Sequence, residues 1–244
     1  MNRRSFCTAL ALAPVAGSAY AIDWGSTLKN ILNSPGGGAA ALTEAEMTGG
    51  LKEALAVGVE RAIKGLARPG GYLNDPAVRI PLPPTLERAE STLRTFGQGK
   101  AVDDFAATVN RAAEAAVPEG AGIVGDAIRG MSIADAKKLL DGADDAATQY
   151  FREKTWDRLR AAMLPIVQQA TARVGVTSAW KNLVTRAGPA AGLLGDSADL
   201  DGYVTGKTLD GLFVKLADEE RAIRRDPVAR STDLLKKVFG QTSR

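Results

Sequence analysis

Carboxylates are the side chains of this chain best suited to form a catalytic or cation-binding centre. They are densest in one turn, at Asp141, Asp144 and Asp145. The turn that contains them precedes a long segment with helical periodicity. One acid of such a turn commonly caps the helix that follows, which contributes about 1 kcal/mol and accounts for one carboxylate or two. The surplus acid predicts either a cation site or a carboxylate acid–base pair with Glu114 or Glu153.

Missing residue types exclude much of the remaining chemistry. The chain contains no histidine, and its single cysteine, Cys7, lies in an N-terminal segment that we expect to be removed. Without these residues the mature chain can form no disulfide and no Cys/His zinc site. It also lacks a Ser-His-Asp or Cys-His catalytic pair. We therefore expect no cofactor and favour a binding protein over an enzyme.

A second candidate region is the segment 72–84, whose four prolines prevent a continuous helix. Apolar side chains at every second position from 78 to 82 alternate with Arg79 and Pro81. This pattern predicts an extended strap with one apolar edge. The simpler interpretation is a packed connector. The functional alternative is a rigid rim of a cleft that presents Arg79 to an anionic ligand.

The helix predicted after this segment carries polar residues that could belong to the same site. Arg111 and Glu114 are three residues apart, so we expect them to pair on the helix surface with a few tenths of a kcal/mol. If these polar side chains and Arg79 met in one concave pocket, that pocket would be the ligand-binding site. The candidate ligand-binding residues are Arg79, Asn110, Arg111, Glu114, Asp144 and Asp145.

The segment from Ser197 to Thr208 has part of the spacing of a calcium-binding EF-hand loop. With Gly202 at the sharp turn, Asp199 and Asp201 fall at the third and fifth positions. Serine and threonine occupy the first and last positions, so the bidentate glutamate is missing and calcium would bind very weakly. The alternative is that one of the two aspartates caps the following helix. We assign no metal and keep Asp199 and Asp201 as a weak candidate.

The elements that must position these residues are helices. Apolar spacing, capping signals and Gly/Pro stops predict an all-α fold, a compact multi-helix bundle with one proline-rich extended segment at about 72–84. Thr43 with Glu46, and Ser132 with Asp135, have the spacing of capping boxes. The helices are expected at 43–68, 85–96, 100–117, 123–131, 132–140, 145–174, between Gly175 and Gly188, at 199–225 and from Ser231.

Two further expectations concern the long helices. Pro165 lies inside the longest one and predicts a kink or break near residues 161–165. The acids at 218–220 are expected on a solvated face of the 199–225 helix, paired with the arginines at 221, 224 and 225.

The first 21 residues have the pattern of an export signal. Arg3 and Arg4 precede a short apolar run, and Ala19-Tyr20-Ala21 gives a small-x-small site for cleavage after Ala21. The arginine pair fits either the Sec or the twin-arginine route. The apolar run is too short to span a bilayer, so we expect a periplasmic or otherwise exported protein without a stable transmembrane segment after cleavage.

The mature chain is expected to hold a flexible Gly/Pro linker at 22–42 and a single helical domain at 43–240. The sequence has 31 Lys and Arg against 28 Asp and Glu, and two of the arginines lie in the leader. The remainder is close to neutral, so a nucleic-acid partner is not expected.

Six stretches, in order along the chain, resemble the bacterial domain of unknown function 4197 family. The resemblance covers residues 43–240 and implies an exported, mostly helical protein with no established activity, so it brings no catalytic or ligand residues. The stretches are Gly50-Leu-Lys-Glu-Ala-Leu55, Val78-Arg-Ile-Pro-Leu-Pro83, Asn110-Arg-Ala-Ala-Glu-Ala-Ala-Val-Pro118, Asp144-Asp-Ala-Ala-Thr-Gln-Tyr-Phe-Arg152, Asp210-Gly-Leu-Phe213 and Leu234-Leu-Lys-Lys-Val-Phe-Gly240.

Three functions from different classes are compatible with these observations. The favoured one is a non-catalytic binding or interaction module of the cell envelope, with an unknown envelope partner or small ligand. The second is a carboxylate-dependent hydrolase of cell-wall glycan. It requires Asp144 or Asp145 to face Glu114 or Glu153 across a groove, with the carboxyl groups roughly 5–10 Å apart. The third is a calcium-stabilised structural protein.

Overall fold

The computed structural model describes residues 43–97, 99–172 and 199–225. Contacts divide the chain into Met1–Ala41 and Leu42–Arg244, and all described residues belong to the second unit. Every regular element in these ranges is helical, so the predicted all-α class is confirmed. The predicted signal peptide, the Gly/Pro linker, the helix between Gly175 and Gly188 and the terminal helix from Ser231 lie outside the described residues.

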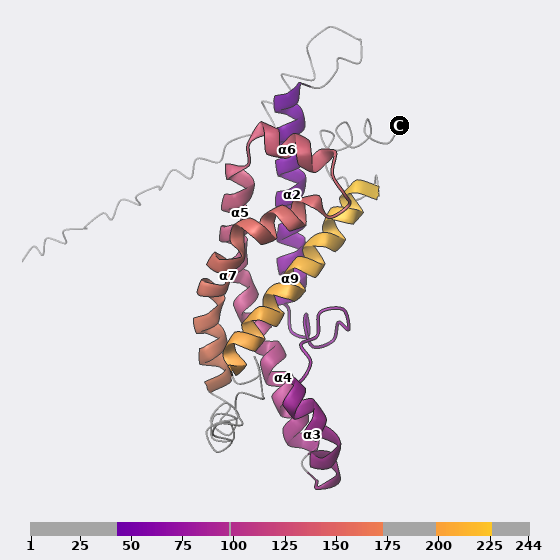
Figure 1. The fold of residues 1–244 in the computed structure, drawn as a ribbon, viewed down its shortest axis with the longest axis vertical. Coiled ribbons are helices and arrows are strands. Elements are labelled where there is room, and N and C mark those ends of the chain that lie inside the picture. Colours follow the sequence, from indigo (N-terminus) through magenta and orange to yellow (C-terminus); the bar gives the residue numbers. More distant parts are fainter. Residues whose placement is uncertain (1–42, 98, 173–198, 226–244) are drawn as a thin grey trace, which may run out of the picture. The chain divides into compact units, whose positions relative to one another are not determined.

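The helices begin and end close to their predicted positions. Thr43 with Glu46, and Ser132 with Asp135, both form the capping boxes that the sequence predicts. In chain order the elements are α2 (Glu44–Ala67), α3 (Pro84–Thr95), α4 (Gly99–Ala116), the short 3-10 helix η1 (Val117–Glu119), α5 (Gly120–Gly130), α6 (Ile133–Leu140), α7 (Ala146–Ala172) and α9 (Leu200–Arg225) (Figure 1).

The core lies where α9 packs against both α7 and α2, and where α4 packs on α7. Figure 1 shows α9 running obliquely across α2. Leu159 and Met163 of α7 and Leu209 and Leu212 of α9 have no exposed surface. These positions belong to the apolar stripes that the helical periodicity predicts, because a 3.6-residue repeat aligns them on one face of each helix.

Of the kink or break predicted near Pro165, the break is wrong, since α7 runs without interruption from Ala146 to Ala172; the kink stays a prediction. Proline inside a helix costs about 3 kcal/mol or more, since it removes one hydrogen bond and crowds the preceding turn. Met163 and Val167, on either side of the proline, are fully buried. Their burial stabilises the helix on both sides of the missing bond, so the helix remains continuous.

Residues 72–83, which we call the strap, connect α2 to α3 without forming a helix. The predicted alternation along the strap is confirmed. Val78 and Ile80 are buried and Leu82 is partly buried, whereas Arg79 and Pro81 between them are exposed. The strap therefore places one apolar edge in the core and turns its charged residue outward.

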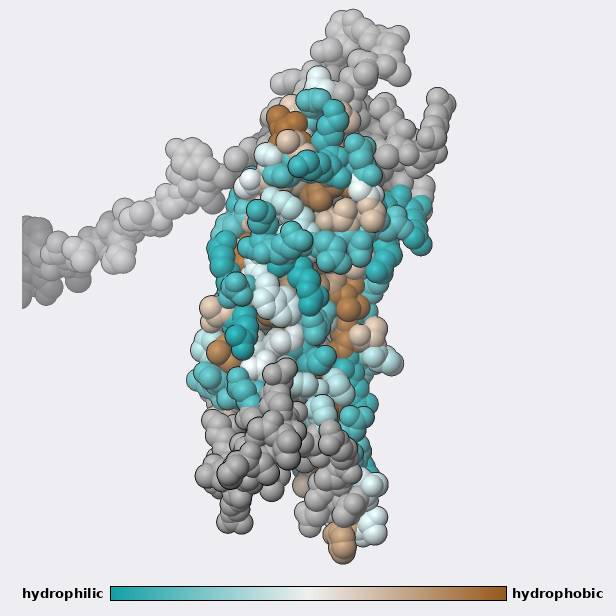
Figure 2. Space-filling view, in the orientation of Figure 1, coloured by the Kyte–Doolittle hydropathy of each residue, from teal (hydrophilic) through white to brown (hydrophobic). Residues whose placement is uncertain are grey.

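Hydrophilic residues predominate on the face of the protein drawn in Figure 2, and the hydrophobic ones on it are scattered. Among the described residues, the large hydrophobic side chains that remain exposed are Phe96 just after α3, Ile133 on α6 and Val214 on α9. Such isolated residues are normal on a protein surface.

Candidate functional site

The centre of the strap is held by one buried amide side chain. Asn110 lies on α4 with no exposed surface. Its Oδ1 accepts a hydrogen bond from the Ile80 amide at 2.8 Å, and its Nδ2 donates to the Ile80 carbonyl at 3.1 Å and to the Ala106 carbonyl at 2.8 Å. A single side chain thus satisfies both backbone polar groups of Ile80, which would otherwise be buried without partners.

The start of the strap is held one turn further along α4. The carboxylate of Glu114, which is 7% exposed, accepts hydrogen bonds from the amides of Tyr72 and Leu73 at 3.2 and 3.4 Å. The Tyr72 phenol donates to the carbonyl of Thr208 on α9 at 2.8 Å. Burial, and then the negative charge of Glu114, raise the pKa of Tyr72 well above its usual range, so the phenol stays protonated.

The packing of Tyr72 explains one glycine of α9. A Cβ atom at Gly211 would lie 2.6 Å from the Tyr72 ring and 3.2 Å from Val78. Only glycine leaves room there for the ring to cross the helix. The strap is therefore fixed between α4 and α9 by polar and apolar contacts together.

A pocket of about 350 Å³ lies between the strap, α3 and α4, and we call it the strap pocket. Its deepest residues are apolar and buried: Ile80 from the strap and Val102 and Ala106 from α4. Charged residues from the strap, α3 and α4 surround this floor. The pocket thus has the apolar base and the few convergent polar groups that are typical of small-molecule sites.

Three of the charged residues around the strap pocket form ion pairs with one another. Arg94 pairs with Glu90 at 2.8 Å and with Asp103 at 2.7 Å. These hydrogen bonds, first the one to Asp103, raise the pKa of Arg94, and the bond from Arg94 lowers the pKa of the Asp103 carboxyl. In contrast, the side chains of Arg79 and Glu87 form no hydrogen bond or ion pair with any described residue, although both line the pocket. Arg79 is close enough to Asp103 for its charge to lower the pKa of that carboxyl, but its hydrogen-bonding groups, like those of Glu87, are not used by the described residues.

The structure separates the six predicted ligand-binding residues. Arg79 lines the strap pocket, whereas Asn110 and Glu114 lie buried beneath the strap and position it. Arg111 is exposed on α4, and the expected Arg111–Glu114 surface pair is wrong because Glu114 is buried against backbone amides. Asp144 and Asp145 lie in the turn between α6 and α7.

The predicted carboxylate pair across a groove is also wrong for Glu114. Glu114 binds the backbone of Tyr72, which packs at Gly211 of α9, whereas Asp144 pairs with Arg225 at the end of α9. Gly211 and Arg225 are separated by about 20 Å along α9, at about 1.5 Å per residue. Glycoside hydrolysis needs carboxyl groups within about 10 Å, so this pair cannot perform it.

The helix that follows the acidic turn is capped by Glu220, from another helix. The carboxylate of Glu220 accepts hydrogen bonds from the amides of Ala147 and Thr148 at 3.0 and 2.8 Å and from the Thr148 hydroxyl at 2.8 Å. Glu220 is only 4% exposed, so the expectation of a solvated face is wrong for this residue. Its negative charge lies at the positive end of the α7 dipole.

Arg224 extends the same network to α6. Its guanidinium donates to Glu220 at 2.9 Å and to the carbonyls of Leu139 and Leu140 at 2.7 and 3.4 Å. These carbonyls belong to the last turn of α6, where a cation complements the helix dipole. One buried ion pair on α9 thus caps the end of one helix and the start of the next.

The two aspartates of the turn have other partners. Asp144 forms an ion pair with Arg225, whose hydrogen bond lowers the pKa of the Asp144 carboxyl. Asp145 accepts a hydrogen bond of 3.4 Å from the Gln149 side chain. Among the described residues, no backbone amide of α7 donates to either carboxylate. The aspartate cap expected at the start of α7 is therefore absent, and Glu220 caps the helix instead.

The weak calcium candidates also have structural partners. Asp199 caps α9, because its Oδ1 accepts from the Gly202 amide at 3.0 Å. Asp201 is buried and accepts from the Thr171 hydroxyl of α7 at 2.7 Å. Within the described ranges no group of three or more His, Cys, Asp or Glu could hold a metal ion. The helix-cap alternative is thus confirmed for Asp199.

Comparison with known families agrees with the resemblance. The family model described as "Protein of unknown function (DUF4197)" matches residues 41–240. The chain belongs to this family. The family description assigns no activity, so it identifies no functional residues in the strap pocket or elsewhere. No curated protein and no solved structure matches the chain significantly.

Within the described ranges, none of the helices combines the length and the apolar character that crossing a bilayer requires.

The residue of the strap pocket that sequence reasoning missed is Glu87. It lies in the first turn of α3, where an acid complements the helix dipole, and so gives no functional signal of its own. Its significance comes only from its position in the pocket with Arg79.

Proposed function

We propose that the protein is a non-catalytic binding module of the cell envelope that takes a small ligand in the strap pocket. The observation that supports this function most directly is Arg79. This residue lines a pocket with apolar lining residues and forms no ion pair with the described residues. An arginine fork of this kind binds a carboxylate or phosphate through two parallel hydrogen bonds.

The rigidity of the strap supports the same proposal. Asn110 and Glu114 bind the backbone on both sides of Arg79, so the chain that carries the guanidinium is ordered before any ligand arrives. A ligand then does not have to order the rim of its own site, and this saves binding free energy. A packed connector alone would not need a charged residue that lies beside an apolar pocket and forms no hydrogen bond or ion pair with the described residues.

The charges also indicate the class of ligand. Arg79 on the strap attracts an anionic group, Glu87 on α3 attracts a cationic group, and the floor contacts an apolar body. A hydrophobic amino acid or short peptide with free termini has all three features. A volume of about 350 Å³ suits a molecule of that size.

Isothermal titration calorimetry with the dipeptide Leu-Leu and its C-terminal amide tests the proposal. A charge-assisted hydrogen bond contributes about 1.5–3 kcal/mol, so the free carboxylate should bind about tenfold more tightly or better. Arg79→Gln should remove this difference, whereas Arg111→Gln, the control on an exposed arginine of α4, should keep it. Undetectable Leu-Leu binding, or a preference that survives in Arg79→Gln, would refute the proposal.

The envelope location rests on the leader predicted at residues 1–21 and has its own test. Mass spectrometry of the protein from a periplasmic fraction should find Ile22 as the first residue. A full-length chain recovered from the cytoplasm would contradict the location while leaving the ligand experiment unaffected.

A further inference from the structure

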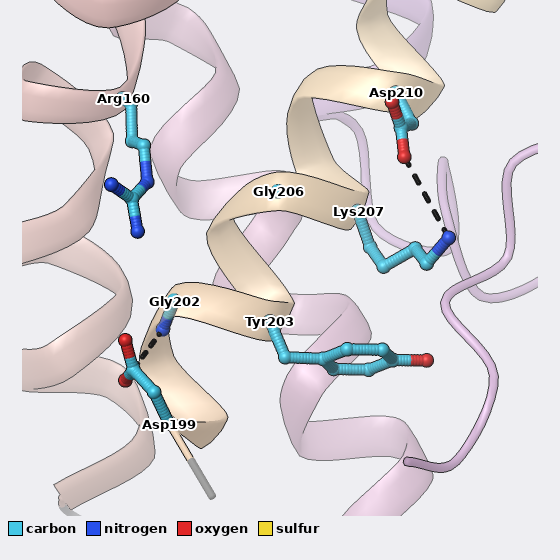
Figure 3. A pocket seen from close by; sticks show the side chains of 7 residues that line it. All are labelled: Arg160, Asp199, Gly202, Tyr203, Gly206, Lys207 and Asp210. Atoms are coloured by element: carbon cyan, nitrogen blue, oxygen red, sulfur yellow. Dashed lines mark hydrogen bonds and ion pairs between the residues drawn. The ribbon is translucent and has the colours of Figure 1, made fainter. Parts of the chain in front are cut away.

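A second pocket, of about 390 Å³, lies between α7 and the first half of α9, and we call it the α7–α9 pocket. Its described lining shares no residue with the strap pocket. Figure 3 shows Arg160 of α7 on one side and Tyr203 and Lys207 of α9 on the other, with Gly202 and Gly206 between them.

Gly206 leaves the backbone of α9 open at this pocket, as helical glycines with equal space do at Gly49, Gly65, Gly122 and Gly130. Glycine inside a helix costs about 1 kcal/mol relative to alanine, so it usually has a packing reason. At Gly202 that reason is the Asp199 carboxylate, 2.2 Å from where a Cβ would lie, and at Gly211 it is Tyr72. At Gly206 a Cβ would meet nothing within 4 Å. The missing side chain instead leaves the backbone of α9 open to the pocket.

The sign of a binding role is a guanidinium without an ion pair. Two cations, Arg160 and Lys207, and two aspartates line the pocket, so its described lining is neutral overall. Asp199 is occupied by the Gly202 amide at 3.0 Å. Asp210 is shared between Arg152 at 2.8 Å and Lys207 at 3.6 Å. Arg160 forms no hydrogen bond or ion pair with any described residue, and its guanidinium lies beside the pocket (Figure 3).

Tyr203 supplies a fixed wall. Its hydroxyl donates to the Pro81 carbonyl of the strap at 3.3 Å, so the ring is held at its far end. An aromatic ring offers an apolar surface for another ring to lie against. Lys207 and Asp210, next to it, provide a donor and an acceptor suited to hydroxyl groups.

We propose that the α7–α9 pocket is a separate binding site for an anionic sugar, meaning a hexose ring that carries a carboxylate or a phosphate. Arg160 binds the anionic group through its planar fork. The sugar ring lies across the open backbone at Gly206 and against Tyr203, while Lys207 and Asp210 bind hydroxyl groups. No lining residue is common to the two pockets, and the hydrogen bond from Tyr203 to Pro81 links this pocket to the strap.

Four probes distinguish the possible ligands in a calorimetric titration: glucuronate, glucose 6-phosphate, glucose and inorganic phosphate. At least one of the two anionic sugars should bind about tenfold more tightly than glucose and than phosphate, because it alone uses both halves of the site. The anionic sugar that binds more tightly shows whether the site prefers a carboxylate or a phosphate. If glucose binds equally well, or phosphate alone does, the anionic-sugar site is refuted.

Two variants locate the binding. Arg160→Gln should reduce the affinity for the anionic sugar about tenfold and leave the affinity for glucose unchanged. Arg158→Gln is the matched control on the same helix, since Arg158 pairs with Asp126 on α5 and does not line the pocket. An equal loss in both variants would overturn the assignment to Arg160.

Gly206→Ala separates a binding role from a structural one. Alanine favours the helix and meets no neighbour, so the variant should melt at a higher temperature. Its methyl group enters the surface on which we place the sugar, so affinity should fall at the same time. A variant that is stabilised and binds as tightly as the wild type would refute this placement of the sugar.

Discussion

Replacing Glu220 by glutamine keeps the size of the side chain and removes its charge, at a position whose two oxygens accept five hydrogen bonds. Glutamine has one acceptor oxygen, and the amide nitrogen that replaces the second one cannot accept. If the oxygen stays toward Ala147 and Arg224, the amide of Thr148 loses its partner. A buried donor without a partner costs about 1–3 kcal/mol.

The charge of Arg224 adds to this cost. Its side chain is 12% exposed and loses the carboxylate that balances it. Removal of one partner from a buried ion pair typically costs about 3–5 kcal/mol. Because Arg224 retains the carbonyls of Leu139 and Leu140, the lower end applies, and we expect Glu220→Gln to lower the free energy of unfolding by about 3 kcal/mol.

Urea unfolding followed by far-UV circular dichroism measures this change, with Glu219→Gln as the control on the adjacent residue. Glu219 is partly exposed and lies 3.9 Å from Arg61, so its loss should cost less than about 1 kcal/mol. Hydrogen exchange should also show faster exchange of the amides of Ala147 and Thr148 in Glu220→Gln. Equal stabilities of the two variants, or a cost below about 1 kcal/mol for Glu220→Gln, would refute the conclusion that Glu220 and Arg224 together cap α7 and α6.

Two further predictions concern the strap. Gly211→Ala should destabilise the protein by about 2 kcal/mol, because the added methyl group overlaps the buried Tyr72 ring, and a urea midpoint at or above that of the wild type would contradict this. Asp75 pairs with Lys215 at 2.7 Å, and this hydrogen bond, followed by one from the Ala77 amide, lowers the pKa of the Asp75 carboxyl in the folded state. The pair therefore stabilises the protein above the unfolded-state pKa of about 3.9, and this contribution is lost as the pH falls through the lower folded-state value. The free energies of unfolding of wild type and Asp75→Asn, measured by urea titration, should differ by less than about 1 kcal/mol for this partly exposed pair. The difference should close below about pH 4, and a difference that is constant from pH 7 to pH 2 would rule the mechanism out.

The helices were predictable because their signals are local. A capping box such as that of Thr43 and Glu46 joins residues three apart, and the apolar stripes repeat within a single helix. The strap was predictable for the same reason, since its prolines and its alternation at Arg79 act over neighbouring residues. Even the exposure of Arg79 followed from this short-range pattern.

The polar anchors were not predictable as such, because each joins segments that are distant in sequence. Asn110 and Glu114 bind backbone groups some 30 to 40 residues earlier, and backbone groups have no signature in the sequence. Glu220 did leave a signal. The buried stripe of α9 passes from Leu216 to Ile223, and helical spacing places position 220 between them on the same face. A carboxylate on such a stripe must be paired, which indicates a buried cap.

The acidic turn suggested a functional site because its surplus charge had no visible partner in the sequence. In the folded protein the end of α9 supplies that partner, since Asp144 pairs with Arg225 and is close enough to Arg224 for its charge to favour the ionised carboxyl. An excess of charge along the sequence is therefore weak evidence for chemistry when folding can neutralise it. A charge that lines a pocket and still lacks an ion pair after folding is stronger evidence, and Arg79 and Arg160 meet that condition among the described residues.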